Sequence, residues 1–274
     1  MAEKENPKQP KDLVQPLPEE LEAVGEEPEI KELEEKIEES QIIDRKLRAL
    51  NREEATKRAS LDSWVPKTKL GLAVKSGKEK NLDKILSSGK RIMEPQIIDT
   101  LVNLETDLLL IGQSKGKFGG GKRRAWRQTQ KKTKEGNVLT FSSMAVVGDR
   151  NGHVGLGYGK AKETLPTREK ALRDAKLSLI KVTLGFETPK SESSDSKPHT
   201  VPFKVQGKCG SVRLTILPAP RGTGLVIGDE CKKILRLAGI KDVYSDTKGK
   251  VRTTFNTAKA CIDALKKTSW EMKE

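Results

Sequence analysis

The sequence predicts an α+β protein with two successive domains and a charged N-terminal extension. Its 274 residues leave room for about two domains. Apolar residues and glycines alternate strictly from Val154 to Gly159, which predicts a strand in a β-hairpin. Strand-like segments are twice followed by an apolar stripe at helical spacing. We therefore expect an α-β-β-β-α domain followed by a β-β-α-β-α domain.

The charge of the chain is unevenly distributed. The formal net charge is +14, but residues 1–40 contain 14 acidic and 5 basic residues, a net of −9, so the rest of the chain carries +23. Such a basic body favours a polyanionic partner, most often nucleic acid. Residues 1–27 have the composition of a disordered tail, and hydrophobic content is only 34% overall. Between 28 and 57, apolar residues recur near helical spacing, which is typical of a docking helix or of a charged extension that contacts nothing.

Composition also limits the kinds of site and the cellular compartment that we expect for this protein. Cys209, Cys231 and Cys261 are far apart in sequence and odd in number, which fits buried thiols in a reducing cytosol. The two histidines form no cluster with cysteines at metal-ligand spacing. No apolar run approaches the ~20 residues of a membrane-spanning helix, and nothing directs export. We expect a cytoplasmic protein that has no membrane association, catalytic residue, metal or cofactor.

The hairpin from Phe141 to Lys160 is the central motif. Gly148–Gly152 predicts its turn, and Val154, Leu156 and Tyr158 share one face of the return strand. The other face carries only glycines, so we predict that the backbone of a partner, anionic in view of the nearby cations, lies on it. The residues assigned to this contact are Arg150, Asn151, His153, Gly155, Gly157, Lys160 and Lys162. An ordinary exposed edge hairpin is the alternative. The glycine spacing fits neither a dinucleotide fingerprint nor a phosphate-binding P-loop.

A wholly basic segment precedes the hairpin. Gly112 to Lys134 contains no acidic residue, has a glycine run and includes one tryptophan. Cations neutralise phosphates, glycine permits close approach and tryptophan stacks on bases, so this loop is predicted to bind RNA. A solvated loop is the alternative. The predicted contacts are Lys115, Lys117, Lys122, Arg123, Arg124, Trp126, Arg127, Lys131, Lys132 and Lys134.

Other elements complete the first domain, which we place at 61–184 after the extension 1–60. Trp64 before a proline predicts an extended anchor. A short helix is expected from Pro95 to Val102 and an apolar strand from Leu108 to Ile111. A helix beginning near Pro166 closes the domain, with Ala171, Leu172, Ala175, Leu179 and Val182 as its stripe. This order is similar to the double-stranded-RNA-binding fold.

The second domain is placed at 199–268, after a linker at 185–198 and before a tail at 269–274. Strands are expected at 200–205 and 211–217, joined at Gly207–Gly210. Asp229 is predicted to cap a helix that Gly239 ends. A strand through Val243 and a last helix follow, with Cys231 and Cys261 in the core.

The segment Pro218–Gly224 combines prolines with glycines around one cation. The prolines fix the backbone before Arg221, and the glycines allow tight bends. We predict that it is an assembly element in which Arg221 and Thr223 meet RNA; an acidic neighbour is the alternative partner for Arg221. A phosphate site of a small-molecule kinase is the rival interpretation, although no metal-binding acid is evident near the loop.

These motifs resemble the ribosomal protein S5 family of the small subunit, in its archaeal and eukaryotic branch. The resemblance covers Asp62 to Lys267 and rests on five segments: 64–71, 145–163, 198–212, 217–225 and 238–243. It implies a double-stranded-RNA-binding-like domain and the family's second domain. It also implies binding to 16S-type rRNA, contacts with ribosomal proteins S4 and S8, proximity to mRNA as it enters the subunit, and a part in decoding accuracy.

The chain departs from the family pattern in places. Asn137 stands where the family usually has a basic residue, and Ser143 where it has a small apolar one. The basic segment is also longer than expected. Some relatives have a cysteine cluster in the linker, whereas 185–198 has none, so no zinc is implied. A free double-stranded-RNA-binding regulator is a further alternative function.

Overall fold

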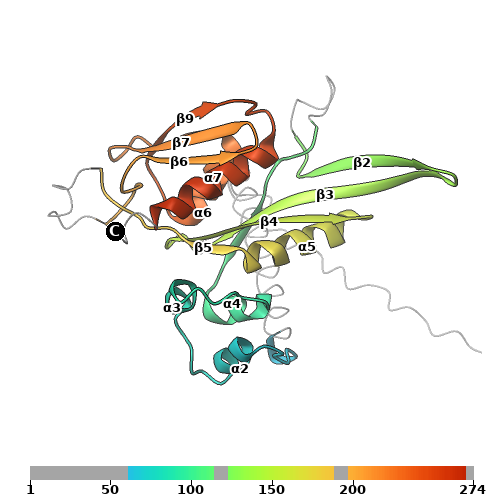
Figure 1. Ribbon diagram of the computed structural model, residues 1–274, viewed down its shortest axis with the longest axis horizontal. Coiled ribbons are helices and arrows are strands. Elements are labelled where there is room, and N and C mark those ends of the chain that lie inside the picture. Colours follow the sequence, from blue (N-terminus) through green and yellow to red (C-terminus); the bar gives the residue numbers. More distant parts are fainter. Residues whose placement is uncertain (1–60, 114–122, 188–196, 270–274) are drawn as a thin grey trace, which may run out of the picture. The chain divides into compact units, whose positions relative to one another are not determined.

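In the computed structural model, which describes residues 61–113, 123–187 and 197–269, the first sheet is built around one long strand (Figure 1). All pairings in this five-stranded sheet are antiparallel. The inner end of the long strand β3 pairs with β1, and its outer part pairs with β2. Its strands are β1 (Glu105–Leu108), β2 (Trp126–Thr133), β3 (Gly136–Gly148), β4 (His153–Ala161) and β5 (Leu179–Lys181). The predicted apolar strand 108–111 is therefore displaced, since β1 ends at Leu108.

The hairpin is confirmed, but the prediction for its glycine face is wrong. Gly155, Gly157 and Gly159 lie against helix α5 (Thr164–Leu177) of the same chain. A Cβ atom on Gly157 would clash with the backbone of Ala171 and Ala175. The bare face therefore lets a helix of the chain itself approach β4 closely, and it is closed to RNA. Helix α5 follows β4 almost directly in sequence, but the glycine pattern alone does not show which backbone lies on the bare face.

Helix α5 is shorter at its C-terminus than predicted. It begins at Thr164, two residues before Pro166, and Ala171 and Ala175 are fully buried as expected. Leu179 and Val182 are buried too, but they follow the helix: Leu179 begins β5. The apolar spacing thus continues through a change from helix to strand.

Three short helices extend the layer formed by α5: α2 (Lys69–Lys75), α3 (Leu82–Ser87) and α4 (Pro95–Leu101). The predicted helix at Pro95 is confirmed. Trp64 is a buried anchor, and its indole Nε1 donates to Glu94 Oε2 at 2.9 Å. Glu94 also accepts the N–H groups of Lys67 and Thr68. The extended segment that contains Trp64 is therefore short, because helix α2 begins at Lys69. The side chain of Thr68 caps the N-terminus of this helix.

The second sheet has four strands in the order β6-β7-β9-β8. Its elements are β6 (Val205–Cys209), β7 (Val212–Pro218), β8 (Leu225–Val226), α6 (Asp229–Ala238), β9 (Val243–Lys248) and α7 (Thr254–Thr268). The strand predicted at 200–205 is wrong, because Gly207 lies inside β6 beneath the backbone of α7 rather than in a turn. Gly228, not Asp229, occupies the N-cap of α6. Gly239 ends α6 as predicted, with φ 91°.

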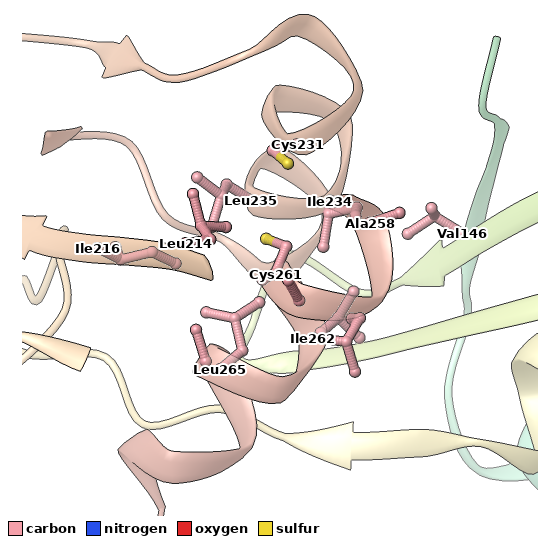
Figure 2. Close-up of a cluster of buried hydrophobic side chains, with 14 of the residues drawn as sticks. Val146, Leu214, Ile216, Cys231, Ile234, Leu235, Ala258, Cys261, Ile262 and Leu265 are labelled. Carbon is pink, nitrogen blue, oxygen red and sulfur yellow. The ribbon is translucent and has the colours of Figure 1, made fainter. Parts of the chain in front are cut away.

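Helices α6 and α7 lie between the two sheets (Figure 1). Figure 2 shows Cys231, Ile234, Cys261 and Leu265 of these helices meeting the second sheet, while Val146 of β3 reaches the same cluster. Both cysteines are buried core residues, as predicted. A hydrogen bond with Cys231, together with burial, raises the pKa of the Cys261 thiol well above its usual range. None of the described helices is long and apolar enough to cross a membrane.

The turn between β3 and β4 reaches into the second half of the fold. The backbone N–H of Arg150 donates to the carbonyl of Leu237 at 2.9 Å, and that of Gly152 donates to Ala238 at 3.1 Å. Leu237 and Ala238 are the last residues of α6, whose terminal carbonyls have no partner within the helix. The first sheet therefore caps a helix of the second.

His153 is part of this anchorage and does not face solvent, so its assignment to an RNA contact is wrong. It is only 8% exposed, and its ring lies between two carboxylates. Nδ1 is 2.6 Å from Asp149 of the turn, and Nε2 is 3.0 Å from Asp83 of α3. The hydrogen bond with Asp149 is the main cause that raises the pKa of His153 above 6.5. The imidazole joins the turn to the helical layer.

We expect Gly157→Ala to destabilise the fold, because its Cβ must displace the backbone of α5. Overpacking of this kind costs about 1–3 kcal/mol in the free energy of unfolding. Gly228→Ala is the matched control, since no atom lies within 4 Å of the added Cβ. Its expected cost is smaller, up to about 1 kcal/mol, because alanine is less favourable than glycine at the N-cap of α6. Urea unfolding of both variants measures the difference, and equal stabilities would contradict the packing described.

The contribution of His153 to stability should depend on pH. Because its pKa is raised in the folded state, the charged imidazole stabilises the fold fully below about pH 6.5. This contribution is lost as the pH rises through the raised pKa. The difference in unfolding free energy between the wild type and His153→Gln should therefore be greatest near pH 6 and shrink in alkaline solution. A difference that is constant with pH would show that the charge has no such role.

Candidate nucleic-acid interface

Strands β2 and β3 form a two-stranded arm that extends past α5 (Figure 1). Part of the segment predicted as a flexible loop is therefore a strand, since Trp126–Thr133 pairs with Gly136–Ser143 in continuous register. Thr129 and Thr140 face each other across the arm, with their hydroxyl oxygens 3.2 Å apart. The segment was predicted to be a loop because a glycine run precedes β2 and because β2 contains few apolar residues.

The cations of the arm lie on both of its faces. Arg127 and Lys131 alternate onto one face, and Lys132 falls on the other. Lys160 of β4 belongs to the first face, because Ser142 pairs with both Arg127 and Lys160. All four side chains are exposed, as is Lys134 at the tip. None of them forms an ion pair with a carboxylate in the described parts of the chain.

Trp126 is placed on the opposite face from Arg127, toward α5. Its neighbour across the arm, Ser143, donates its hydroxyl to the carbonyl of Thr167 in α5. The guanidinium of Arg168 lies over the indole ring, 5.6 Å from its centroid. One face of the ring is thus covered by a cation of the same chain, which leaves Trp126 only partly available to a base.

Arg123 and Arg124 lie at the base of the arm and are exposed. The carbonyl of Arg124 accepts the N–H of Gly112 at 2.9 Å, which closes the segment between them. Burial raises the pKa of nearby Glu230, although the positive charges of Lys233 and Arg123 oppose this. The Glu230 carboxylate accepts the N–H of Leu110, so it is engaged within the fold.

The predicted contact residues in the β3–β4 turn and at the far end of β4 differ in their bonding partners. Arg150 has φ 59°, and its exposed guanidinium donates to Glu105 at 2.7 Å. Asn151 is exposed, with its N–H donated to Asp149. Lys162 lies just beyond β4 and is exposed, as is Lys160. The structure thus separates the cations at the far end of β4 from the turn, whose backbone is committed to α6.

The Pro218–Gly224 segment is braced from within. The guanidinium of Arg221 is exposed and donates to the carbonyl of Lys197 at 2.9 Å. Thr223 donates its N–H to Pro220, and Gly224 donates to Asp242 Oδ1 at 2.8 Å. Asp242 also lies 3.0 Å from Nδ1 of the buried His199. The described residues contain no cluster of three His, Cys, Asp or Glu side chains that could hold a metal.

Sequence patterns missed a group of cations beside the turn. Lys232, Arg236 and Lys241 line a cavity of about 510 Å³ together with Arg150. These residues come from three separate segments, so no local pattern predicts that they meet. Lys115, Lys117 and Lys122, which were predicted to contact RNA, lie outside the described residues.

Comparison with known proteins agrees with this architecture. Residues 122–183 match the model of the ribosomal protein S5 N-terminal domain, and 207–270 match that of its C-terminal domain. A protein of Nanoarchaeum equitans named small ribosomal subunit protein uS5 is 47% identical, over 77% of this chain and 90% of the relative. Proteins of the same name from Methanocaldococcus jannaschii and Hyperthermus butylicus are 42% and 43% identical, over 76% and 75% of this chain and 89% of each relative. This chain belongs to the ribosomal protein S5 family.

Proposed function

We propose that the chain is a structural, non-enzymatic constituent of the small ribosomal subunit in the cytoplasm, where it binds 16S-type rRNA. The β2–β3 arm is the observation that carries this proposal. Its cations project from two faces of a strand pair and have no carboxylate partner among the described residues. Cations held in this way neutralise phosphates and release counterions, which favours binding to a nucleic acid.

The finer assignments belong to the same proposal. We propose that residues 61–184 act as a double-stranded-RNA-binding-like domain and residues 199–268 as the second domain, joined at 185–198. The basic arm then meets rRNA, while other surfaces meet ribosomal proteins S4 and S8 and mRNA where it enters the subunit. A role in translational accuracy would follow from this position. Family membership and the arrangement of α4, α5 and the first sheet support these assignments.

The cations proposed to bind RNA are those that the fold leaves unpaired. Arg127, Lys131, Lys132 and Lys160 form the central set. Arg124, Lys134 and Lys162 flank it, and Arg221 and Thr223 belong to a separate exposed loop. A kinase-like role for that loop gains no support from the geometry, because Arg221 is bound to a backbone carbonyl and Asp242 to a backbone N–H.

Neutralising the arm should weaken rRNA binding and its dependence on salt. The test variant is Arg127→Gln with Lys131→Gln and Lys132→Gln. If all three meet phosphates, the slope of log affinity against log salt should fall in magnitude by about 2–3, at just under one unit per contact. Filter binding of purified protein to small-subunit rRNA between about 50 and 200 mM salt measures the slope.

The control removes three cations that already face carboxylates: Lys90, Lys176 and Lys181, each changed to Gln. It should leave the slope close to that of the wild type. In cell lysates, the tagged wild type should sediment with small subunits through a sucrose gradient, and the arm variant should shift toward the free fractions. Sedimentation of the wild type only as free protein would reject the ribosomal role and favour a free RNA-binding regulator.

A further inference from the structure

One face of the second sheet is open and carries none of the residues proposed above to bind RNA. Helices α6 and α7 cover its other face, where Val212, Leu214 and Ile216 of β7 are buried. Because side chains alternate along a strand, Arg213, Thr215 and Leu217 must point to the open face. No described element covers that face of the sheet (Figure 1).

Three cations form a continuous row across this face. Arg213 of β7 pairs with Lys208 of β6 on one side and with Lys248 of β9 on the other. All three are exposed, and none forms an ion pair with a described carboxylate. Like charges directly opposite each other destabilise a sheet. With strands ~4.8 Å apart, the row spans ~10 Å, which is wider than one small anion needs.

The surroundings of this basic row add further positive charge. Lys208 and Arg213 line a cavity of about 280 Å³ with Gln206 and Lys267. The Nζ of Lys267 donates to the Gln206 carbonyl at 2.6 Å and lies 3.5 Å from Asp263. Residues 247–262 contain no acid and contribute the exposed cations Lys248, Lys250, Arg252 and Lys259.

Acidic residues and one aromatic side chain also lie near the basic row, and Asp174 and Asp263 line a further cavity with Lys208. Asp246 is the acid on the open face, in the neighbouring row beside Thr215. Asp263 accepts the backbone N–H of Lys208 at 3.0 Å, so part of its charge is already engaged. Tyr244 lies two rows from Lys248 on the same face and is 42% exposed. Its ring is available for stacking on a base.

We propose that the basic row Lys208–Arg213–Lys248 binds the phosphate backbone of rRNA, as a second RNA contact on the opposite half of the fold from the arm. This inference rests on the proposed ribosomal function. An RNA strand is favoured over an acidic protein because lysine is depleted from protein–protein interfaces, whereas rows of cations are typical of phosphate contacts. Bound phosphates also remove the repulsion within the row.

The test neutralises the basic row in the full chain by Lys208→Gln, Arg213→Gln and Lys248→Gln. The salt slope for small-subunit rRNA should fall in magnitude by about two units, while the Lys90, Lys176 and Lys181 control keeps the wild-type slope. The midpoint of thermal unfolding should stay the same or rise, because neutralisation relieves like-charge repulsion. A lower midpoint with an unchanged slope would assign the row to folding and overturn the inference.

The outcomes separate this inference from the function on which it rests. If the arm variant lowers the slope but the row variant does not, the inference fails and the ribosomal function stands. If the wild type shows no saturable rRNA binding, both fail. In assembled subunits, ultraviolet crosslinking should join the peptide containing Lys248 or Tyr244 to RNA. Crosslinking of that peptide to a protein alone would assign the face to a protein partner and overturn the inference.

Discussion

The fold depends on the contact between the β3–β4 turn and the end of α6. A helix leaves its last carbonyls without partners, and here two of them accept the N–H groups of Arg150 and Gly152. Gly239 makes the approach possible, since a Cβ at this position would clash with the Arg150 carbonyl. Lys233 adds a second link, donating from α6 to Leu108 and Asp107 of β1. These polar contacts surround an apolar core to which both sheets contribute.

The contact between the β3–β4 turn and α6 determines where the basic arm and the basic row lie. Strand β3 ends at this turn, and its opposite end forms one side of the basic arm. Helix α6 accepts the hydrogen bonds of the turn, and together with α7 it packs against the second sheet, whose open face carries the basic row. Two groups of exposed cations are therefore held on opposite parts of one rigid core. A partner that binds both must match their spacing, which suits a folded RNA better than a flexible polyanion.

The sequence predicted local features well and long-range partners poorly. The hairpin, the helix at Pro95, the Gly239 helix end and the buried cysteines follow from short periodic patterns. The glycine face of β4 and Gly207 in β6 were misinterpreted for one reason: the glycines let a helix of the same chain pack closely on the strand, and the glycine pattern does not say which backbone does so. For the candidate site, Arg127, Lys131 and Lys132 were predicted to contact RNA from a loop, whereas the structure places them exposed on strand β2. The row of Lys208, Arg213 and Lys248 depends on the register of three strands, which composition does not give.

The turn contact can be tested directly by native-state hydrogen exchange of the backbone amides of Arg150 and Gly152. Both donate to α6, so they should exchange only when the core itself opens. Their protection should then equal that of the buried α6 amides, such as Leu235, and should fall with it in parallel as urea is added. Fast exchange of Arg150 and Gly152 while Leu235 stays protected would mean that the turn opens on its own. The two sheets would then not be locked together by this contact, which would contradict the account.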